Sequence, residues 1–189
     1  GMLQEFTAII LSGGMSILCF ENFLATTSIG YFTGMEMQHK VKKVLKIGIV
    51  GFSRNQFDKI AARKILEGMF EDLKTKHPEK EIEIVSGYTH SGVPKIAYEL
   101  ADTFGFTTVG FSANQALKVR SGVYPVAKVI LHGEKFGDES REFVNYIDGL
   151  IRVGGGQQSR NETALFKDLN NDKPLERMVK EFEVKWYGN

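Results

Sequence analysis

From residue 44 onward, short apolar runs alternate with segments whose apolar residues recur at helical spacing. The first pair shows the pattern: Val44 to Gly51 is apolar except for Lys46, and the stretch that follows has an apolar stripe containing Phe57, Ile60 and Ala61. Short apolar runs next to glycine predict buried strands, and a stripe with a period of about 3.6 residues predicts a helix packed on them. Strands that alternate with helices imply right-handed crossovers and a parallel sheet. We therefore expect an α/β three-layer sandwich with a mainly parallel sheet.

The same two periods assign the rest of this segment. Ser53 or Asn55 is the expected cap of the first helix, and Pro78 follows its end. The predicted strands are 44–51, 81–86, 107–111, 128–132 and 149–153. The predicted helices are about 56–76, 93–103, 139–146, one that starts near 160, and 175–186. This order is typical of a Rossmann-like fold.

Composition limits the classes of function. A chain of 189 residues with 42% hydrophobic residues can bury one proper core. A formal net charge of +1 lacks the basic excess of a nucleic-acid-binding protein. Cys19 is the only cysteine and the histidines are scattered, so neither a disulfide within the chain nor a metal site is expected.

Residues 1–43 form an N-terminal apolar extension to the Rossmann-like domain at 44–189. Gly1 resembles a tag-cleavage scar, and the apolar stretch Phe6 to Phe32 predicts a hairpin or a short helix, with Met35 or Met37 as an alternative natural start. Polar residues interrupt the stretch, and no basic residue precedes it, so it fits neither a membrane span nor a signal peptide. We expect a cytoplasmic protein with no membrane partner that forms a homodimer through this apolar surface.

Glycines stand where the predicted strands end. In an open parallel sheet these turns meet at the carboxyl edge, where ligands bind, and the following helices offer free N–H groups to an anion. The first such loop gives Gly51, Ser53 and Arg54 as candidate phosphate contacts, although a helix cap with a surface arginine explains them equally. The second loop gives Gly87, Ser91 and Gly92, which a structural turn also explains. Thr89 and His90 add donors there, and His90 is a weaker candidate for a catalytic base.

The loop after residue 153 carries the strongest signal. Gly154, Gly155 and Gly156 lie beside polar side chains, a poor packing element but a suitable nest for an anion. Ser159 adds a hydroxyl. Glu162 is expected in the first turn of the next helix, where the helix dipole alone accounts for a carboxylate. Its functional interpretation is an acceptor for a ribose hydroxyl, or a catalytic carboxylate.

These residues resemble the SLOG group of Rossmann-like proteins, which includes the Lonely Guy (LOG) nucleotide hydrolases and the molybdenum-cofactor carriers. The group's pattern is P-G-G-x-G-T-x-x-E. Here Gly154 stands at the proline, Gly155 and Gly156 match two glycines, Ser159 replaces threonine, and Glu162 matches the glutamate. The likeness covers about residues 44–174. Gln158 replaces the third glycine, and Arg141 lies closer to Asp148 than the arginine that partners the glutamate in LOG enzymes.

The resemblance implies binding of a nucleotide or a related phosphorylated small molecule, and it identifies no cofactor beyond such a nucleotide ligand. The alternative is N-glycosidic hydrolysis of a nucleoside monophosphate, or a deoxyribosyltransferase-like reaction. Glu162 and Arg141 would then be catalytic, or Arg120 or Arg160 in place of Arg141. A second alternative is a protein-interaction domain that has lost its ligand. The sequence lacks a dinucleotide fingerprint, a P-loop and a nucleophile elbow, which disfavours those functions.

Overall fold

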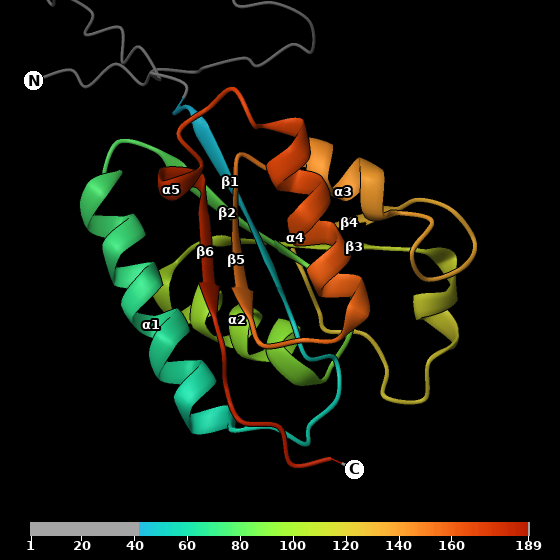
Figure 1. The fold of residues 1–189 in the computed structure, drawn as a ribbon. Helices are drawn as coiled ribbons and strands as arrows, with labels where there is room; N and C mark the ends of the chain where they lie inside the picture. Colours follow the sequence, from blue (N-terminus) through green and yellow to red (C-terminus); the bar gives the residue numbers. More distant parts are fainter. Residues whose placement is uncertain (1–41, 189) are drawn as a thin grey trace, which may run out of the picture. The chain divides into compact units, whose positions relative to one another are not determined.

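The structure, a computed structural model, describes residues 42–188 (Figure 1). Its sheet has the strand order β4-β3-β2-β1-β5-β6, and every neighbouring pair is parallel. The strands are β1 Val44–Gly51, β2 Glu81–Ser86, β3 Thr107–Ser112, β4 Lys128–Leu131, β5 Gly149–Val153 and β6 Val179–Phe182. The helices are α1 Lys59–Lys76, α2 Gly92–Phe104, α3 Ser140–Tyr146, α4 Gln157–Leu169 and α5 Leu175–Met178, with a 3-10 turn at Asn114–Lys118. The predicted Rossmann-like α/β class is confirmed.

Two apolar cores lie on the two faces of the sheet. Alternate residues of β1 point to opposite faces, so Ile49 joins the core beneath α1 and α2, while Val50 joins the core beneath α3 and α4. Large buried side chains fill both cores, Phe70 on the first side and Phe166 on the second. These layers form the predicted three-layer sandwich, which fixes the strand ends and their loops in space.

The strand order reverses between β1 and β5. From β1 the chain adds β2, β3 and β4 outward on one side, and β5 and β6 then extend the sheet on the other side. Open α/β sheets bind ligands outside the carboxyl ends of the strands at such a reversal. The loops after Gly51 and Val153 therefore flank the expected binding position, because these two residues are partners in the β1–β5 ladder.

Helix α1 begins later than the predicted position near residue 56, and its cap is Asp58 rather than Ser53 or Asn55. The Asp58 side chain accepts a hydrogen bond from the Ala61 N–H at 2.9 Å. The delay has a tertiary cause, because the backbone of Phe57 forms an antiparallel bridge with Trp186. Helix α4, in contrast, begins at Gln157, earlier than predicted, which places Glu162 in its second turn.

The predicted helix at 175–186 is wrong beyond its first turn. Helix α5 ends at Met178, and β6 then pairs with β5 in parallel register, Val153 opposite Phe182. Phe182 and Val184 pack on the α1–α2 core, and Trp186 continues the same alternation. This period of two residues is the signature of a strand.

The expectations for the N-terminal extension, a hairpin or helix and an oligomer contact, fall on residues outside the described range. Within residues 42–188, no helix is both long enough and apolar enough to span a membrane. The same residues contain no cluster of three or more metal-ligating side chains.

Candidate ligand cleft

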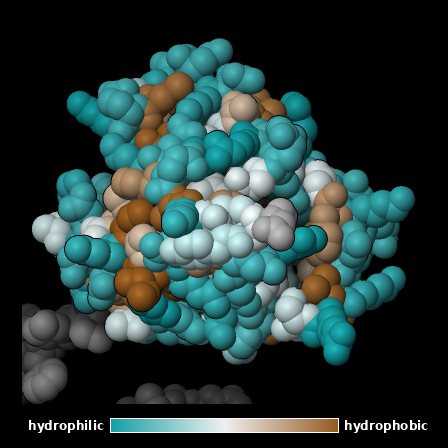
Figure 2. Space-filling model, turned by 60° about the horizontal axis from the view of Figure 1, so that its bottom comes forward, coloured by the Kyte–Doolittle hydropathy of each residue, from teal (hydrophilic) through white to brown (hydrophobic). Residues whose placement is uncertain are grey.

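A cleft of 1190 Å³ opens at the carboxyl edge of the sheet. Figure 2 shows this end of the molecule, where residues of intermediate hydropathy occupy the middle of a largely hydrophilic face and hydrophobic patches lie beside them. The loops after β1, β2 and β5 line the cleft, together with parts of α3 and α4. Its apolar wall includes Phe111, Phe143 and Phe136. A volume of this size is at the upper end for small-molecule sites.

The N-terminus of α4 opens into the cleft. Gly156, Gln157, Gln158 and Ser159 all line it, and within residues 42–188 their backbone N–H groups have no hydrogen-bond partner. The Ser159 hydroxyl donates to the Gly156 carbonyl at 3.0 Å. Free N–H groups at the positive end of a helix dipole form an anion-binding site.

Gly155 allows this turn to lie against the end of β1. Its φ of +103° lies in the left-handed region. A Cβ at this position would stand 2.0 Å from Ser159 Oγ and 3.0 Å from the Gly51 backbone. Any other residue would therefore push α4 away from the β1 loop. Gly155 is not among the residues that line the cleft, so its role in this turn is steric, and its predicted contact with a phosphate stays a prediction.

The N-terminus of α2 is already occupied. The Val93 N–H donates to the Phe52 carbonyl at 2.7 Å, and the Gly92 N–H donates to Asn55 Oδ1 at 3.1 Å. A Cβ on Gly92, whose φ is +66°, would meet the Phe52 carbonyl oxygen at 2.1 Å. The Ser91 hydroxyl donates to the Ser53 carbonyl at 2.7 Å. The loop after β1 therefore caps the N-terminus of α2, whereas the N-terminus of α4 keeps free N–H groups.

Arg54 is the only basic side chain among the lining residues of the described chain. It lies exposed on the β1 loop beside Ser53, which also lines the cleft. From the second loop, Gly87, Thr89 and Ser91 reach the lining. Positive potential in the cleft thus comes from Arg54 and from the end of α4.

Two buried carboxylates also line the cleft, Glu139 at 4% exposure and Glu162 at 7%. Gln158 Nε2 donates to Glu139 Oε1 at 3.3 Å and to Glu162 Oε1 at 3.0 Å. Ser140 Oγ donates to Glu162 Oε1 at 2.8 Å. Burial raises the pKa of Glu162 above its ordinary value, the bonds from Gln158 and Ser140 oppose this, and the charge of Glu139 adds to the rise.

The remaining predicted residues lie elsewhere. Arg141 is exposed on α3 and does not line the cleft, although Ser140 beside it contacts Glu162. Arg120 is exposed outside the lining. His90 stacks on Tyr124 with ring centroids 5.5 Å apart and is also outside it. Gly154 is buried, and its N–H donates to the Phe182 carbonyl at 2.7 Å.

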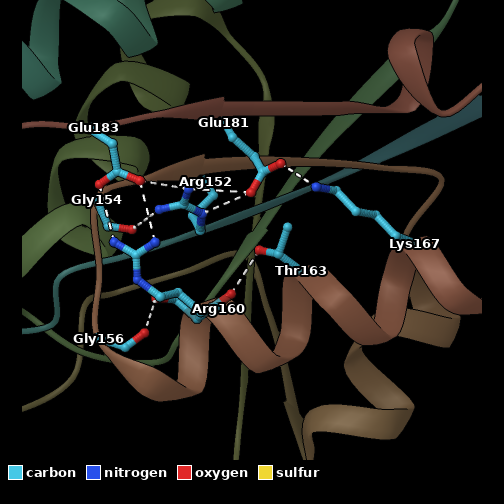
Figure 3. Close-up of polar contacts among 9 residues, drawn as sticks. Arg152, Gly154, Gly156, Arg160, Thr163, Lys167, Glu181 and Glu183 are labelled. Atoms are coloured by element: carbon cyan, nitrogen blue, oxygen red, sulfur yellow. Dashed lines mark hydrogen bonds and ion pairs between the residues drawn. The ribbon is translucent and has the colours of Figure 1, made fainter.

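A polar network joins the far side of α4 to β5 and β6 (Figure 3). The Arg152 side chain is only 6% exposed and donates to the Gly154 carbonyl at 2.9 Å and to Glu183 at 2.8 Å. It also donates to Glu181 at 3.2 Å. Arg160 pairs with Glu183 at 3.2 Å, so its guanidinium is part of this network. Arg152 therefore fixes the position of the glycine turn through its bond to the Gly154 carbonyl.

Sequence reasoning missed several lining residues. Glu139 and Gln157 border the cleft on α3 and α4, and Tyr88 and Trp186 add aromatic surface. The alternation of Phe182, Val184 and Trp186 could have revealed the strand that brings Trp186 back to the β1 loop. No sequence signal distinguishes Glu139 from a surface carboxylate.

No protein-family model matches the sequence, and no curated protein matches it. Among solved structures, a molybdenum cofactor carrier protein from Chlamydomonas reinhardtii is similar, with a TM-score of 0.54 and 18% identity over 74% of this chain and 89% of that chain. A molybdenum cofactor binding protein from the phototrophic bacterium Rippkaea orientalis has a TM-score of 0.54 and 19% identity over 76% of this chain and 78% of that chain. The chain therefore has the Rossmann-like fold of these molybdenum cofactor carrier and binding proteins.

Proposed function

We propose that this protein binds a small phosphorylated molecule, a nucleotide or a related compound, in the cleft at the carboxyl edge of the sheet. The observation that carries the proposal is the free N-terminus of α4, whose first N–H groups line the cleft without partners in the described chain. Arg54 supplies the positive side chain there. A phosphate would receive N–H bonds from the helix end and charge-assisted bonds from Arg54.

The fold supports the same assignment. The two similar structures are named for the molybdenum cofactor, which one carries and the other binds. That cofactor is itself a phosphorylated pterin, so phosphorylated pterins join nucleotides as candidate ligands. The size of the cleft and its mixture of aromatic and polar walls favour a ligand over a domain that only contacts other proteins.

Replacement of Gln157 by proline tests the helix N-terminus directly. Gln157 is the first helical residue, where proline is tolerated, and Gly156 before it has the extended backbone that precedes proline well, with φ −90° and ψ −159°. The change removes one N–H from the cleft without removing a helix hydrogen bond. Gln157→Ala keeps the N–H and is the matched control.

The measurement is a thermal-shift and calorimetric screen of nucleoside mono-, di- and triphosphates, ADP-ribose and phosphorylated pterins. A bound ligand at about a hundred times its Kd adds roughly 2.7 kcal/mol of stability. We expect Gln157→Pro and Arg54→Ala each to weaken the hit by about tenfold, as loss of a charge-assisted bond does. Gln157→Ala and Arg120→Ala should leave it unchanged. A screen with no hit, or a hit that survives both variants, would contradict the proposal.

A second candidate, hydrolysis or transfer at an N-glycosidic bond, is favoured by one observation. Glu162 is a buried carboxylate with a raised pKa beside a second carboxylate, an arrangement that suits protonation or charge stabilisation during glycosidic cleavage. Arg54 would then hold the phosphate, because Arg141 lies outside the cleft lining. Chromatography of the bound nucleotides over time would detect free base. Glu162→Gln should abolish base release and retain phosphate binding.

A further inference from the structure

The carboxylates of the cleft lack any cationic partner. Neither Glu139 nor Glu162 forms an ion pair within residues 42–188. Arg54, the only basic residue of the lining, belongs to the loop after β1, whereas the carboxylates come from the start of α3 and from α4. Buried carboxylates without a compensating charge destabilise a fold, so their presence together in a cleft indicates a role in binding.

These carboxylates retain unused acceptor positions. An ionised carboxylate accepts about four hydrogen bonds. Glu162 receives its two bonds on Oε1, and in the described chain no donor reaches Oε2. Glu139 accepts one bond from Gln158 and one from the Gly137 N–H at 2.8 Å. No further donor of residues 42–188 bonds these carboxylates, so their remaining positions are open to water or to donors of a ligand.

The cleft therefore presents groups of both signs. Its phosphate-binding part combines Arg54 with the N–H groups at the start of α4, and its acidic side is formed by Glu139 and Glu162, which the Gln158 side chain joins and which have no cationic partner in the described chain. An aromatic wall adjoins the acidic side, since Phe143 lies one helical turn after Glu139 and both line the cleft. A flat or sugar-like body can rest on this wall with its donors directed at the carboxylates.

We propose that Glu139 and Glu162 form an acidic specificity pocket, which selects phosphomonoesters whose remaining body is uncharged and carries N–H or O–H donors. Nucleoside monophosphates are the simplest members of this class. The inference rests on the proposed phosphate site and adds the rule that a second anionic group is rejected. Like charges brought together at an interface disfavour binding, which is the source of the selection.

Two matched pairs of ligands test the rule on the sugar and on the base. AMP and adenosine 2′,5′-bisphosphate differ by a phosphate on one hydroxyl. GMP and XMP differ by an amino group that is replaced by an oxo group, which makes the base acidic. Affinities are measured by calorimetry for the parent, for Glu139→Gln, and for Glu142→Gln. Glu142 carries the same charge on α3 and lies outside the cleft lining, so it is the matched control.

In the parent we expect the more anionic member of at least one pair to bind about tenfold weaker or worse. Glu139→Gln should reduce this ratio several-fold, and Glu142→Gln should leave it unchanged. Glu162→Gln serves as a second variant if Glu139→Gln does not fold. The proposal is overturned if both anionic members bind as tightly as their partners, an outcome that leaves the phosphate site intact. If none of the four compounds binds, the proposed function fails as well.

Discussion

Helix α4 separates two pairs of glutamates that have opposite surroundings. On the β6 side, Glu181 and Glu183 accept ion pairs from cationic side chains, and their pKa values are lowered, first by the bond from Lys167 for Glu181 and from Arg152 for Glu183. On the cleft side, Glu139 and Glu162 share an amide donor, and burial raises the pKa of Glu162. The cations of the β6 side are Arg152, Arg160 and Lys167.

The contrast separates a contribution to stability from a contribution to binding. The β6 network ties two strands to a helix and secures the turn at Gly154. The cleft pair has no ion pair in the described chain and lines the cleft, where a ligand can reach it. One residue type thus has two roles, and the presence of a cation decides between them.

Loss of Arg152 should have the largest effect on this comparison. Arg152→Met keeps the apolar bulk and removes one hydrogen-bond donor from each of Glu181, Glu183 and the Gly154 carbonyl. We expect the free energy of unfolding to fall by about 2–3 kcal/mol, as for hydrogen bonds to charged groups. Urea denaturation measures the change. Arg160→Met is the control, because the exposed pair with Glu183 is worth less than about 1 kcal/mol. Equal effects of the two changes would show that burial of Arg152 adds nothing.

Glu162→Gln should act in the opposite direction at neutral pH. A raised carboxyl pKa in the folded state means that stability is greatest below the ordinary pKa of about 4.3 and is lost as pH rises through the raised value. The amide keeps an acceptor for Ser140 and Gln158 and removes the charge. We expect a gain on the order of 1 kcal/mol at pH 7 that disappears near pH 4. Thermal melting across this range measures it, and a variant less stable than the parent at pH 7 would count against the uncompensated charge.

The β6 side should show the reverse pH dependence. The pKa values of Glu181 and Glu183 are lowered, so their contribution is present above the ordinary glutamate pKa and is lost as pH falls through the lowered values. We expect the double variant Glu181→Gln, Glu183→Gln to lose less stability than the parent between about pH 4.5 and pH 3. Melting curves in that interval measure the difference. Parallel curves for parent and variant would show that the network makes no pH-dependent contribution.

The smallest effect is expected at Gln158. Its amide lowers the pKa of Glu162 by donating to it, so Gln158→Ala should raise that pKa further. Gln158 is exposed, and the loss in stability should be within about 1 kcal/mol. The pH at which ligand affinity changes should move upward, as followed by calorimetric titration at several pH values. An unchanged pH profile would show that the Gln158 amide does not affect the pKa of Glu162.

Much of the framework could be predicted, because strand and helix periods are local properties. The strands at 44–51, 81–86 and 149–153 match the structure, and the glycine loops meet at the carboxyl edge as a parallel sheet requires. The sequence predicts a helix in place of β6 because the charged residues of this segment resemble a helix surface. In the structure β6 is an edge strand, and Glu181 and Glu183 pair with Arg152.

The site could be predicted only in part. Sequence placed Ser53, Arg54 and Glu162 at the cleft, but it could not show that Phe52 and Asn55 cap α2 and use its free N–H groups. That depends on contact between two loops distant in sequence. The burial of Glu139 likewise arises only when α3 packs beside α4.

The return of the chain end to the β1 loop has a spectroscopic consequence. Trp186 is the single tryptophan among the 189 residues, and it lines the cleft while stacking on Phe52 at 4.8 Å. Excitation of indole therefore observes one position at the cleft mouth, and quenching or a wavelength shift of its emission would report occupancy without a label.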